Sequence, residues 1–435
     1  MTQSAMDVTQ LEHELRTYRP AAMPSLPLNF VWPRYEGASV GNLAATVAQG
    51  LGASLPGALP PLWPDLLGDL LEGVERIVLV TLDSLGWEQL LWVLARRADS
   101  ELARLAQRGR LLPITTTFLS TTNSVLNTLW TGRPPLEHGL PGFEFYLREW
   151  LMAVEAISFS PAVAPFAGAL RNWGFNAEKF IPVPTVAQAL KDHGVATYAV
   201  TARPLIATPL SQMQYRGVAN VEGYEFPSEL WVMLGRVLRE HRGERFFLSG
   251  YWSGVDTLGH HYGPYDTTAD LEIRSIGQLL EAGLLEQLAA AERQGTLLLV
   301  TADHGQIDAP ARAAVRLPDH PQLRDLLVMP PLGEARVPFF YVRSGCYTAA
   351  WNYLHTHLSR PFIYFSQQAF IESGLLGQGT PHAELEYRLG DIIGIARKDA
   401  YFVRDPALAQ RLRGRHGGLD AGEMLVPLLA LRLDA

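Results

Sequence analysis

The stretch Thr296-Leu-Leu-Leu-Val-Thr-Ala-Asp-His-Gly-Gln306 joins an aliphatic run to an acid and an imidazole. The aliphatic part is typical of a strand buried on both faces of a sheet. Asp303 and His304 follow almost directly. For a lone Asp-His pair, a purely structural role is the preferred interpretation, because Asp is a preferred turn and cap residue. Asp303 would then cap a turn, and His304 would lie at the surface. The rest of the chain decides between that interpretation and a pair of ligands.

Short aliphatic runs alternate with helical segments from about residue 74 onward. The pattern predicts strands at 76–81, 196–201, 246–251 and 296–301, separated by helical segments such as 87–97 and the amphipathic 271–293. Strands that alternate with helices favour a mostly parallel sheet with helices on both faces. We therefore predict an α/β protein built as a three-layer α/β/α sandwich.

Composition and charge narrow the class of protein. The 435 residues are 48% hydrophobic, which is enough for a large core in one elaborated domain or two to three smaller ones. The formal net charge of −8 argues against binding to a nucleic-acid duplex, which depends on Lys and Arg meeting phosphates. The single cysteine, Cys346, excludes an intrachain disulfide and a cysteine-based zinc finger. Any metal must therefore be held by His and carboxylates.

We expect no targeting or membrane segment from this sequence. Residues 1–18 have neither a basic start nor an apolar core of signal-peptide length. No run of about 18 uncharged apolar residues occurs. We expect a cytoplasmic protein, and nothing in the sequence indicates its oligomeric state.

Acids and imidazoles recur where predicted strands end, which is where ligands gather in open α/β sheets. Four segments carry them: Asp83, Asp256 with His260, Asp303 with His304, and His416. The interval of four between Asp256 and His260 can place both side chains on one face of a helical turn. Together these segments supply three carboxylates and three imidazoles.

Oxygen and nitrogen ligands without sulfur suit zinc, manganese or a related divalent ion. One four-coordinate centre would leave two of the six ligands idle. Two centres use all six and leave positions open for substrate, as in the metal pairs that transfer phosphoryl groups. Because structural metal sites are usually closed, an open pair favours catalysis.

These motifs resemble the alkaline phosphatase superfamily, specifically its type I phosphodiesterase and nucleotide pyrophosphatase branch. That branch has an Asp after the first core strand, a nucleophile segment ending in Thr-Gly, the pattern Asp-x-x-Gly-His-x-x-Gly-Pro, a strand-end Asp-His-Gly and a late His-Gly. All five occur here in order, and residues 256–264 match the third completely as Asp-Thr-Leu-Gly-His-His-Tyr-Gly-Pro. The resemblance covers roughly residues 74–310 and 390–435.

The resemblance implies which residues hold the metals. One ion would be bound by Asp256, His260 and His416, and the other by Asp83, Asp303 and His304. Two zinc ions are expected, with manganese as the alternative. The neighbouring His261 falls on a variable position of the pattern, so we place it outside the ligand set.

The resemblance also implies a nucleophile. In the family it lies nine residues before the threonine of Thr-Gly, and counting back from Thr131 gives Thr122, which would also contact a metal. Ser120 and Thr121 are neighbouring hydroxyls, so an alternative register stays open. The implied reaction is attack on phosphorus to form a covalent phospho-threonine, which water then hydrolyses.

The substrate class is less clear. In this branch, an Asn five residues after the histidine of a His-Gly pair binds a phosphoryl oxygen. Counting from His138, that position is Phe143 in this sequence. Asn123 or Asn127 is expected to take over the role of the missing Asn. We expect a phosphodiester, pyrophosphate or nucleotide as substrate. Two alternatives stay open: a phosphomonoesterase of the same superfamily, and a catalytically silent metal-binding regulatory module. Neither a P-loop nor a sulfatase-type Cys/Ser-x-Pro-x-Arg motif occurs.

The expected domain organisation has three parts. Residues 1–73 form an N-terminal extension packed on the core, residues 74–310 and 390–435 form the catalytic core, and residues 311–389 form a cap insertion. The aromatic stretches of the cap, 339–341 and 351–365, either stack on a nucleobase or, more in keeping with aromatic residues in general, pack in its interior. A last helix is predicted at 423–431.

Overall fold

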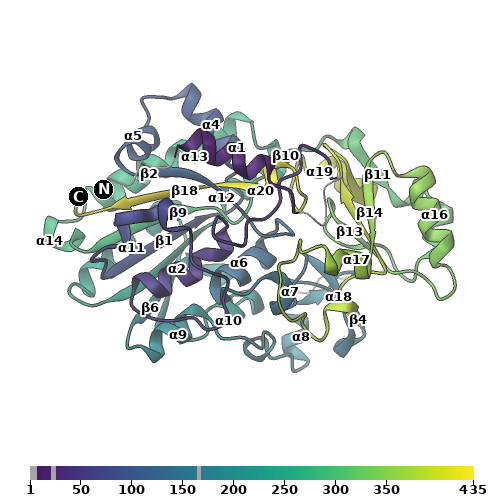
Figure 1. The fold of residues 1–435 in the computed structure, drawn as a ribbon, viewed down its shortest axis with the longest axis horizontal. Coiled ribbons are helices and arrows are strands. Elements are labelled where there is room, and N and C mark those ends of the chain that lie inside the picture. The colour runs from purple at the N-terminus through teal and green to yellow at the C-terminus, as the bar shows by residue number, and fades with distance from the viewer. Residues whose placement is uncertain (1–6, 21–25, 164–167) are drawn as a thin grey trace.

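The computed structural model describes residues 7–20, 26–163 and 168–435. Two seven-stranded sheets lie along the long axis of the molecule, each with its own helices (Figure 1). The first sheet carries β1 (Arg76–Leu82) and β9 (Thr296–Thr301), and the second carries β13 (Pro338–Phe340) and β14 (Phe362–Ser366) at the opposite end of the view. Four hydrophobic clusters fill the interior, and the largest lies around the first sheet.

The first sheet is mostly parallel. Its order is β2 (Arg110–Thr115), β18 (Leu425–Arg432), β9 (Thr296–Thr301), β1 (Arg76–Leu82), β8 (Phe246–Trp252), β6 (Ala196–Ala202) and β7 (Asn220–Tyr224). β1 pairs in parallel with both β8 and β9, whereas β18 runs antiparallel between β9 and β2. Every residue of β1 and β9 is buried, as expected for strands covered on both faces.

Two groups of helices cover this sheet. One group consists of α4 (Trp87–Arg96), α5 (Glu101–Arg108), α11 (Pro227–Glu240), α12 (Gly254–Tyr262) and α13 (Thr267–Leu280). The other consists of α2 (Leu43–Gly50), α6 (Thr122–Thr131), α9 (Val186–Asp192) and α10 (Pro209–Gln214). The groups lie on opposite sides of the sheet (Figure 1). The predicted three-layer α/β/α sandwich is confirmed.

The helix predicted at 423–431 is wrong. A single helical turn, α20 (Ala421–Met424), is followed by β18, which fills the gap between β9 and β2. The apolar run of β18 is buried along almost its whole length. Continuous apolar runs fit a buried strand as well as a buried helix, so periodicity does not distinguish them. The partner strands, which satisfy the backbone hydrogen bonds of β18, decide the outcome.

The second sheet is antiparallel throughout. Its order is β14 (Phe362–Ser366), β15 (Ile392–Ala396), β13 (Pro338–Phe340), β12 (Leu332–Gly333), β3 (Glu144–Leu147), β4 (Met152–Glu155) and β5 (Ser160–Pro161). Helix α16 (Tyr347–His357) contributes Leu354 to the cluster that also contains Phe340. These strands come from inside 311–389 and from outside it, and the division into a core and a cap at those boundaries stays a prediction.

The aromatic stretch 339–341 packs inside the protein. Phe339 and Phe340 are fully buried, and the Tyr341 hydroxyl donates to the carbonyl oxygen of Arg388 (2.8 Å). Of the two interpretations of this stretch, nucleobase stacking and packing in the interior, the second therefore applies to these three residues.

The described part of the N-terminal segment lies against the first sheet and the loops beside it. Helix α1 (Val8–Thr17) places Glu12 where the Trp87 indole donates to it (2.9 Å). Farther on, the Val31 amide donates to Leu419 O (2.8 Å) and the Tyr35 hydroxyl accepts from the Phe118 amide (3.2 Å). The segment thus supports the loops that precede Thr122 and follow His416.

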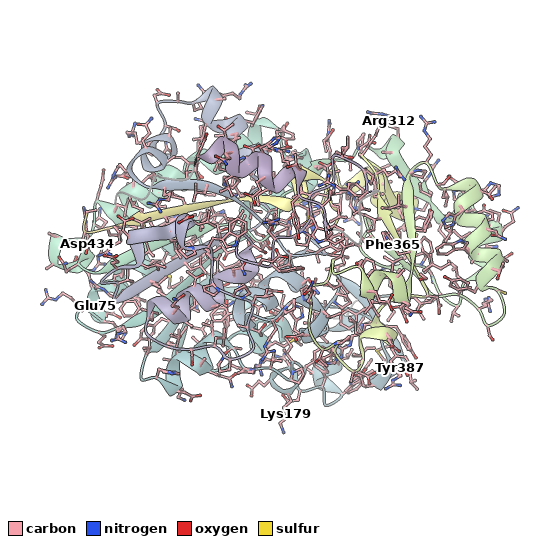
Figure 2. All side chains as sticks on the ribbon, in the orientation of Figure 1. Glu75, Lys179, Arg312, Phe365, Tyr387 and Asp434 are labelled. Atoms are coloured by element: carbon pink, nitrogen blue, oxygen red, sulfur yellow. The ribbon has the colours of Figure 1, made fainter. Side chains whose placement is uncertain are left out.

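The carboxyl-terminal edge of the parallel strands faces the second sheet. Glu75, directly before β1, lies at the end of the molecule far from Phe365 of β14 (Figure 2). Functional residues at that edge therefore lie where the two sheets meet. Among the described residues, no helix is long and apolar enough to cross a bilayer.

Candidate active site

All six predicted metal ligands converge on one edge of the first sheet. Asp83 follows β1, Asp303 and His304 follow β9, and Asp256 with His260 lies on α12, directly after β8. His416 follows the two-residue strand β17 (Gly414–Arg415), which pairs with β10 (Ile307–Asp308). Because parallel strands end at the same edge, segments far apart in the sequence place their side chains together.

The first ligand group is Asp256, His260 and His416, whose ligand atoms lie within 4.8 Å of one another. His260 Nε2 is 3.2 Å from Asp256 Oδ1, and His416 Nε2 is 3.8 Å from the same oxygen. These side chains are partly exposed. The group therefore lies open toward solvent, as a site that binds substrate requires.

The second ligand group is Asp83, Asp303 and His304, also within 4.8 Å of one another and buried. His304 Nε2 is 3.6 Å from Asp83 Oδ1 and 3.6 Å from Asp303 Oδ2. The other Asp303 oxygen, Oδ1, accepts from the backbone amides of Ser84 and His304 (3.0 and 2.9 Å). The other Asp83 oxygen, Oδ2, accepts from the Tyr251 hydroxyl. In each carboxylate, one oxygen accepts the hydrogen bonds that orient the group, and the other oxygen points into the site.

The three histidines present the same ring nitrogen to the site. Each Nδ1 lies beside a backbone carbonyl oxygen: His260 with Gly414 (2.9 Å), His304 with Gly305 (3.0 Å), and His416 with Ser120 (3.1 Å). A carbonyl only accepts, so Nδ1 carries the proton and Nε2 keeps its lone pair, the usual arrangement of a metal-ligating histidine. Burial, followed by the neighbouring His304, lowers the pKa of His416 well below its ordinary value, which keeps that imidazole neutral.

The donor set fits two cations. The Nε2 atoms of His260 and His416 are only 3.2 Å apart, and both carry lone pairs. Asp83 Oδ1 and Asp303 Oδ2 are buried without a hydrogen-bond partner, which is costly for a charged oxygen. Burial, followed by the charges of Asp303 and Asp256, raises the pKa of Asp83 well above its ordinary value. A divalent ion in each group would satisfy these atoms, and nitrogen and oxygen ligands suit zinc or manganese.

Thr122 lies beside both groups. Its Oγ1 is 3.2 Å from His304 Nε2, and the His304 ring stacks on His416 with centroids 4.0 Å apart. Thr122 is also the first residue of α6, where backbone N–H groups of the first turn lack helical partners and attract anions. The structure therefore brings the predicted nucleophile and the six predicted ligands together.

The two neighbouring hydroxyls are engaged elsewhere. Ser120 Oγ donates to Gly418 O (2.8 Å), and the Thr121 hydroxyl donates to Glu334. Of the three adjacent hydroxyls, Thr122 is the one beside the ligand groups. The geometry favours the register that was predicted.

Two cavities meet at the site, and Thr122 and Asp256 line both of them. One, of about 390 Å³, faces the second sheet and is also lined by Phe143, Glu334 and Arg404. The other, of about 400 Å³, lies among the helices of the first sheet; Trp130, Gln214 and Tyr215 are among its lining residues. The site therefore has room for an organic group on either side of a phosphoryl group.

The asparagines proposed as substitutes at the phosphoryl group face elsewhere. Asn123 Nδ2 donates to Gly142 O (2.7 Å), and Asn127 Nδ2 donates to Asn123 O (2.6 Å). Neither lines one of the two cavities, whereas Phe143 lines the first. The substitution by Asn123 or Asn127 is not supported.

Several residues of the site were not predicted. Tyr251 lies at the end of a predicted strand and donates to Asp83. Gln306 follows another predicted strand and donates to Asp256 Oδ1 (3.3 Å). Their positions near strand ends were the sequence signal that could have identified them. Glu334 lies on the β12–β13 hairpin of the second sheet and reaches the site from a segment with no local motif. Burial raises its pKa to about 8, although the hydrogen bond from Thr121 lowers it.

His261 is exposed, in agreement with its place outside the ligand set.

The fold and the site define a phosphoester hydrolase of the alkaline phosphatase superfamily. The family model for type I phosphodiesterase/nucleotide pyrophosphatase matches residues 77–419, and the chain belongs to this family. No curated protein gives a significant sequence match.

Solved structures show the same fold at low sequence identity. Human ectonucleotide pyrophosphatase/phosphodiesterase 5 superposes with a TM-score of 0.62 at 16% identity, covering 82% of this chain and 87% of its own. The murine counterpart gives 0.61 at 16% identity, with 82% and 87% covered. Phosphonoacetate hydrolase from Sinorhizobium meliloti gives 0.58 at 19% identity, with 82% and 90% covered.

Proposed function

We propose that the protein is a two-metal phosphoric ester hydrolase of the phosphodiesterase/nucleotide pyrophosphatase type that works through a covalent phospho-threonine on Thr122. One observation carries the proposal: Thr122 Oγ1 lies 3.2 Å from His304 Nε2, at the start of α6 and beside the two groups of three ligands. A hydroxyl in this position is suited to nucleophilic attack on phosphorus.

The proposed metals are zinc, with manganese as the alternative. Asp256, His260 and His416 would hold one ion, and Asp83, Asp303 and His304 the other, with Thr122 beside it. When bound, such ions supply positive charge that polarises phosphoryl oxygens and lowers the pKa of a hydroxyl or water. With ions bound, the two groups could thus bind a phosphate anion although the protein as a whole is acidic.

The chain contributes orientation and the nucleophile. Free N–H groups in the first turn of α6 hold the phosphoryl oxygens, so that phosphorus faces Thr122 with the leaving oxygen on the opposite side. Thr122 Oγ1 loses its proton to solvent and attacks phosphorus, so that a Thr–O–P bond forms. The bond from phosphorus to the leaving oxygen breaks on the side of Asp256, His260 and His416, and that oxygen takes up a proton from water. The oxygen of a water then loses a proton and attacks phosphorus from that side, the Thr–O–P bond breaks, the phosphate product leaves, and the Thr122 oxygen takes up a proton to restore the hydroxyl. The Tyr251 hydroxyl keeps Asp83 oriented throughout.

The two cavities support a diester as the substrate class, because a monoester has one organic group and a diester has two. Trp130 and Tyr215 in one cavity supply apolar and aromatic surface for a group such as a nucleobase. An inactive variant of murine ectonucleotide pyrophosphatase/phosphodiesterase 5 has been solved with AMP, and the phosphonoacetate hydrolase with phosphonoacetate. We therefore propose an enzyme that acts on a small phosphodiester or nucleotide, with a phosphomonoesterase as second candidate. Its cytoplasmic location is a proposal from the sequence alone.

Paired assays test this function. Turnover of bis(p-nitrophenyl) phosphate should exceed that of p-nitrophenyl phosphate, and both should require a divalent metal. Thr122→Ala should lower kcat at least about a thousand-fold with metal still bound, because removal of an attacking hydroxyl costs that much or more. Thr122→Ser, which keeps a hydroxyl, should retain more activity than Thr122→Ala.

Intact-protein mass spectrometry after acid quenching should show the adduct on Thr122 in the wild type and not in Thr122→Ala. Full activity in Thr122→Ala would refute the nucleophile. Two bound metals without turnover of any ester would favour the silent regulatory module instead. A clear preference for the monoester would favour the phosphomonoesterase.

A further inference from the structure

A fully buried ion pair joins the two sheets next to the site. Arg336 lies on the hairpin between β12 and β13, and Glu423 lies on α20, just before β18. Arg336 Nε donates to Glu423 Oε1 (2.9 Å) and Nη2 donates to Oε2 (2.7 Å), so the contact has two parallel bonds. Both side chains have 0% exposure. Neither belongs to the six metal ligands.

The remaining polar atoms of the pair are also engaged. Arg336 Nη1 donates to Lys398 O and Ala400 O, each at 2.6 Å. Glu423 Oε1 accepts from the Gly418 amide (2.8 Å) and Oε2 from the Asp420 amide (3.3 Å). A buried ion pair is tolerated when every group is satisfied in this way. The pair therefore acts as a rigid support for whatever is bonded to it.

The Glu423 side chain is bonded to the loop that carries His416. Gly418, which donates to Glu423, lies two residues after His416. The carbonyl oxygen of Gly418 accepts from Ser120 Oγ (2.8 Å), and the Ser120 carbonyl oxygen accepts from His416 Nδ1 (3.1 Å). A short chain of bonds thus runs from the carboxylate to the imidazole ring.

The backbone of Glu423 is bonded to the other ligand group. Gly305, directly after His304, donates its amide to Glu423 O (2.8 Å). A change of the Glu423 side chain leaves this backbone bond in place. The two ligand groups therefore depend on Glu423 through different atoms.

Packing around the pair leaves no room for a side chain at Gly418. A Cβ at Gly418 would lie 2.8 Å from Glu423 Oε2 and 3.2 Å from Arg336 Nη2. The Gly418 backbone is in direct contact with Glu423, so the loop that carries His416 is held at this point by the ion pair.

We propose that Glu423, held by Arg336, is a positioning residue for His416: its carboxylate fixes Gly418 so that His416 Nε2 meets Asp256 and His260. The proposal rests on the proposed function, since it assumes an ion at that group. Partners that orient a metal ligand typically contribute 10- to 100-fold in metal affinity. The effect is confined to one ion, because the group of Asp83, Asp303 and His304 is reached through the backbone.

The test compares two double variants that carry no unpaired buried charge. Arg336→Met with Glu423→Gln keeps an oxygen that accepts from Gly418, and Arg336→Met with Glu423→Leu removes it. Each is placed in a single-site background: Asp83→Ala leaves the group with His416, and His260→Ala leaves the group with His304. Zinc affinity is measured by competition with a chromophoric chelator.

In the Asp83→Ala background we expect the Leu variant to bind zinc about 10- to 100-fold more weakly than the Gln variant. In the His260→Ala background the two should bind equally. Equal affinities in the first background, or an equal loss in both, would overturn the proposal. Failure of the wild-type protein to bind either zinc or manganese would instead overturn the two-metal function on which it rests.

A second variant covers the case in which the Leu variant does not fold. Glu423→Asp keeps the charge but shortens the side chain, which withdraws the carboxylate from Gly418. With Arg336 unchanged, it should also weaken zinc binding in the Asp83→Ala background and leave the His260→Ala background unaffected. Unchanged binding in both backgrounds would contradict the proposal.

Discussion

At the scale of single residues, the hydrogen bonds already made by each polar group determine its role. Ser120 and Thr121 use their hydroxyls to hold the His416 loop and Glu334, and Thr122 is the one left beside the ligand groups. The same reasoning applies to Tyr251, which does not ligate a metal in our assignment but orients a residue that does. Burial, followed by the Asp83 charge, raises the pKa of Tyr251 well above its ordinary value, so its hydroxyl remains a donor.

Tyr251→Phe should lower the zinc affinity of the group formed by Asp83, Asp303 and His304 about 10- to 100-fold, because Asp83 loses the donor that orients it. Chelator competition in the His260→Ala background measures this. Tyr224→Phe is the control, since the Tyr224 hydroxyl donates to the Tyr251 backbone carbonyl and not to Asp83. An unchanged affinity in Tyr251→Phe would show that Asp83 is held by other contacts.

At the scale of elements, α6 connects the nucleophile to the His-Gly turn that follows it. His138, on α7 (Pro135–His138), has 0% exposure; its Nδ1 accepts from the Leu140 amide (3.2 Å), and its Nε2 lies 3.1 Å from Thr128 Oγ1 on α6. Burial lowers the pKa of His138 from 6.5 to about 3. The neutral ring therefore secures the turn to the helix that begins at Thr122.

His138 should make folding sensitive to acid. The unfolded chain binds a proton at this residue below pH 6.5 and the folded chain does so only near pH 3, so stability is present above pH 6.5 and is lost as pH falls toward 3. The loss from this group alone is about 1.4 kcal/mol per pH unit. Denaturant unfolding of wild type and His138→Gln between pH 5 and 7 should show a flatter pH dependence in the variant. Parallel curves would mean that His138 does not titrate as its burial indicates.

The elements also show where local patterns succeed and fail. The strands at 76–81, 196–201, 246–251 and 296–301 agree with the structure to within a residue at each end, because each is a short aliphatic run between turn residues. The helix predicted at 423–431 falls mostly on the antiparallel strand β18 (Leu425–Arg432). Its identity depends on β9 and β2, which lie more than a hundred residues away in the chain.

At the scale of the whole molecule, the site forms where the two sheets meet. The first sheet supplies ligands from its carboxyl-terminal edge, and the second supplies Glu334 and Arg336 from one hairpin. Bound ions would therefore stabilise the junction between the two sheets in addition to taking part in the reaction. Without them, the buried Asp83 and Asp303 would face each other with unsatisfied oxygens.

Removal of the metals should lower thermal stability and abolish turnover, because ions that bind the folded state alone stabilise it. At a free concentration about 1,000 times the dissociation constant, one ion contributes about 4 kcal/mol. Calorimetry before and after exhaustive chelation, followed by addition of zinc or manganese, measures the effect. Equal melting temperatures with and without metal would contradict the assignment of both ligand groups.

The sequence by itself determined the fold class and the candidate ligands, because an aliphatic run and the acid or imidazole at its end are neighbours in the chain. Asp83, Asp256, His260, Asp303, His304 and His416 could all be named from strand-end positions and the family motifs, and the structure brings them together with Thr122. Their roles, the domain boundaries and the cytoplasmic location stay predictions. Only the tertiary structure decided the identity of β18, the contribution of Tyr251 and Glu334, and the support that Arg336 and Glu423 give to His416. Those features depend on contacts between residues that are distant in the chain, and no local pattern of residue types encodes such contacts.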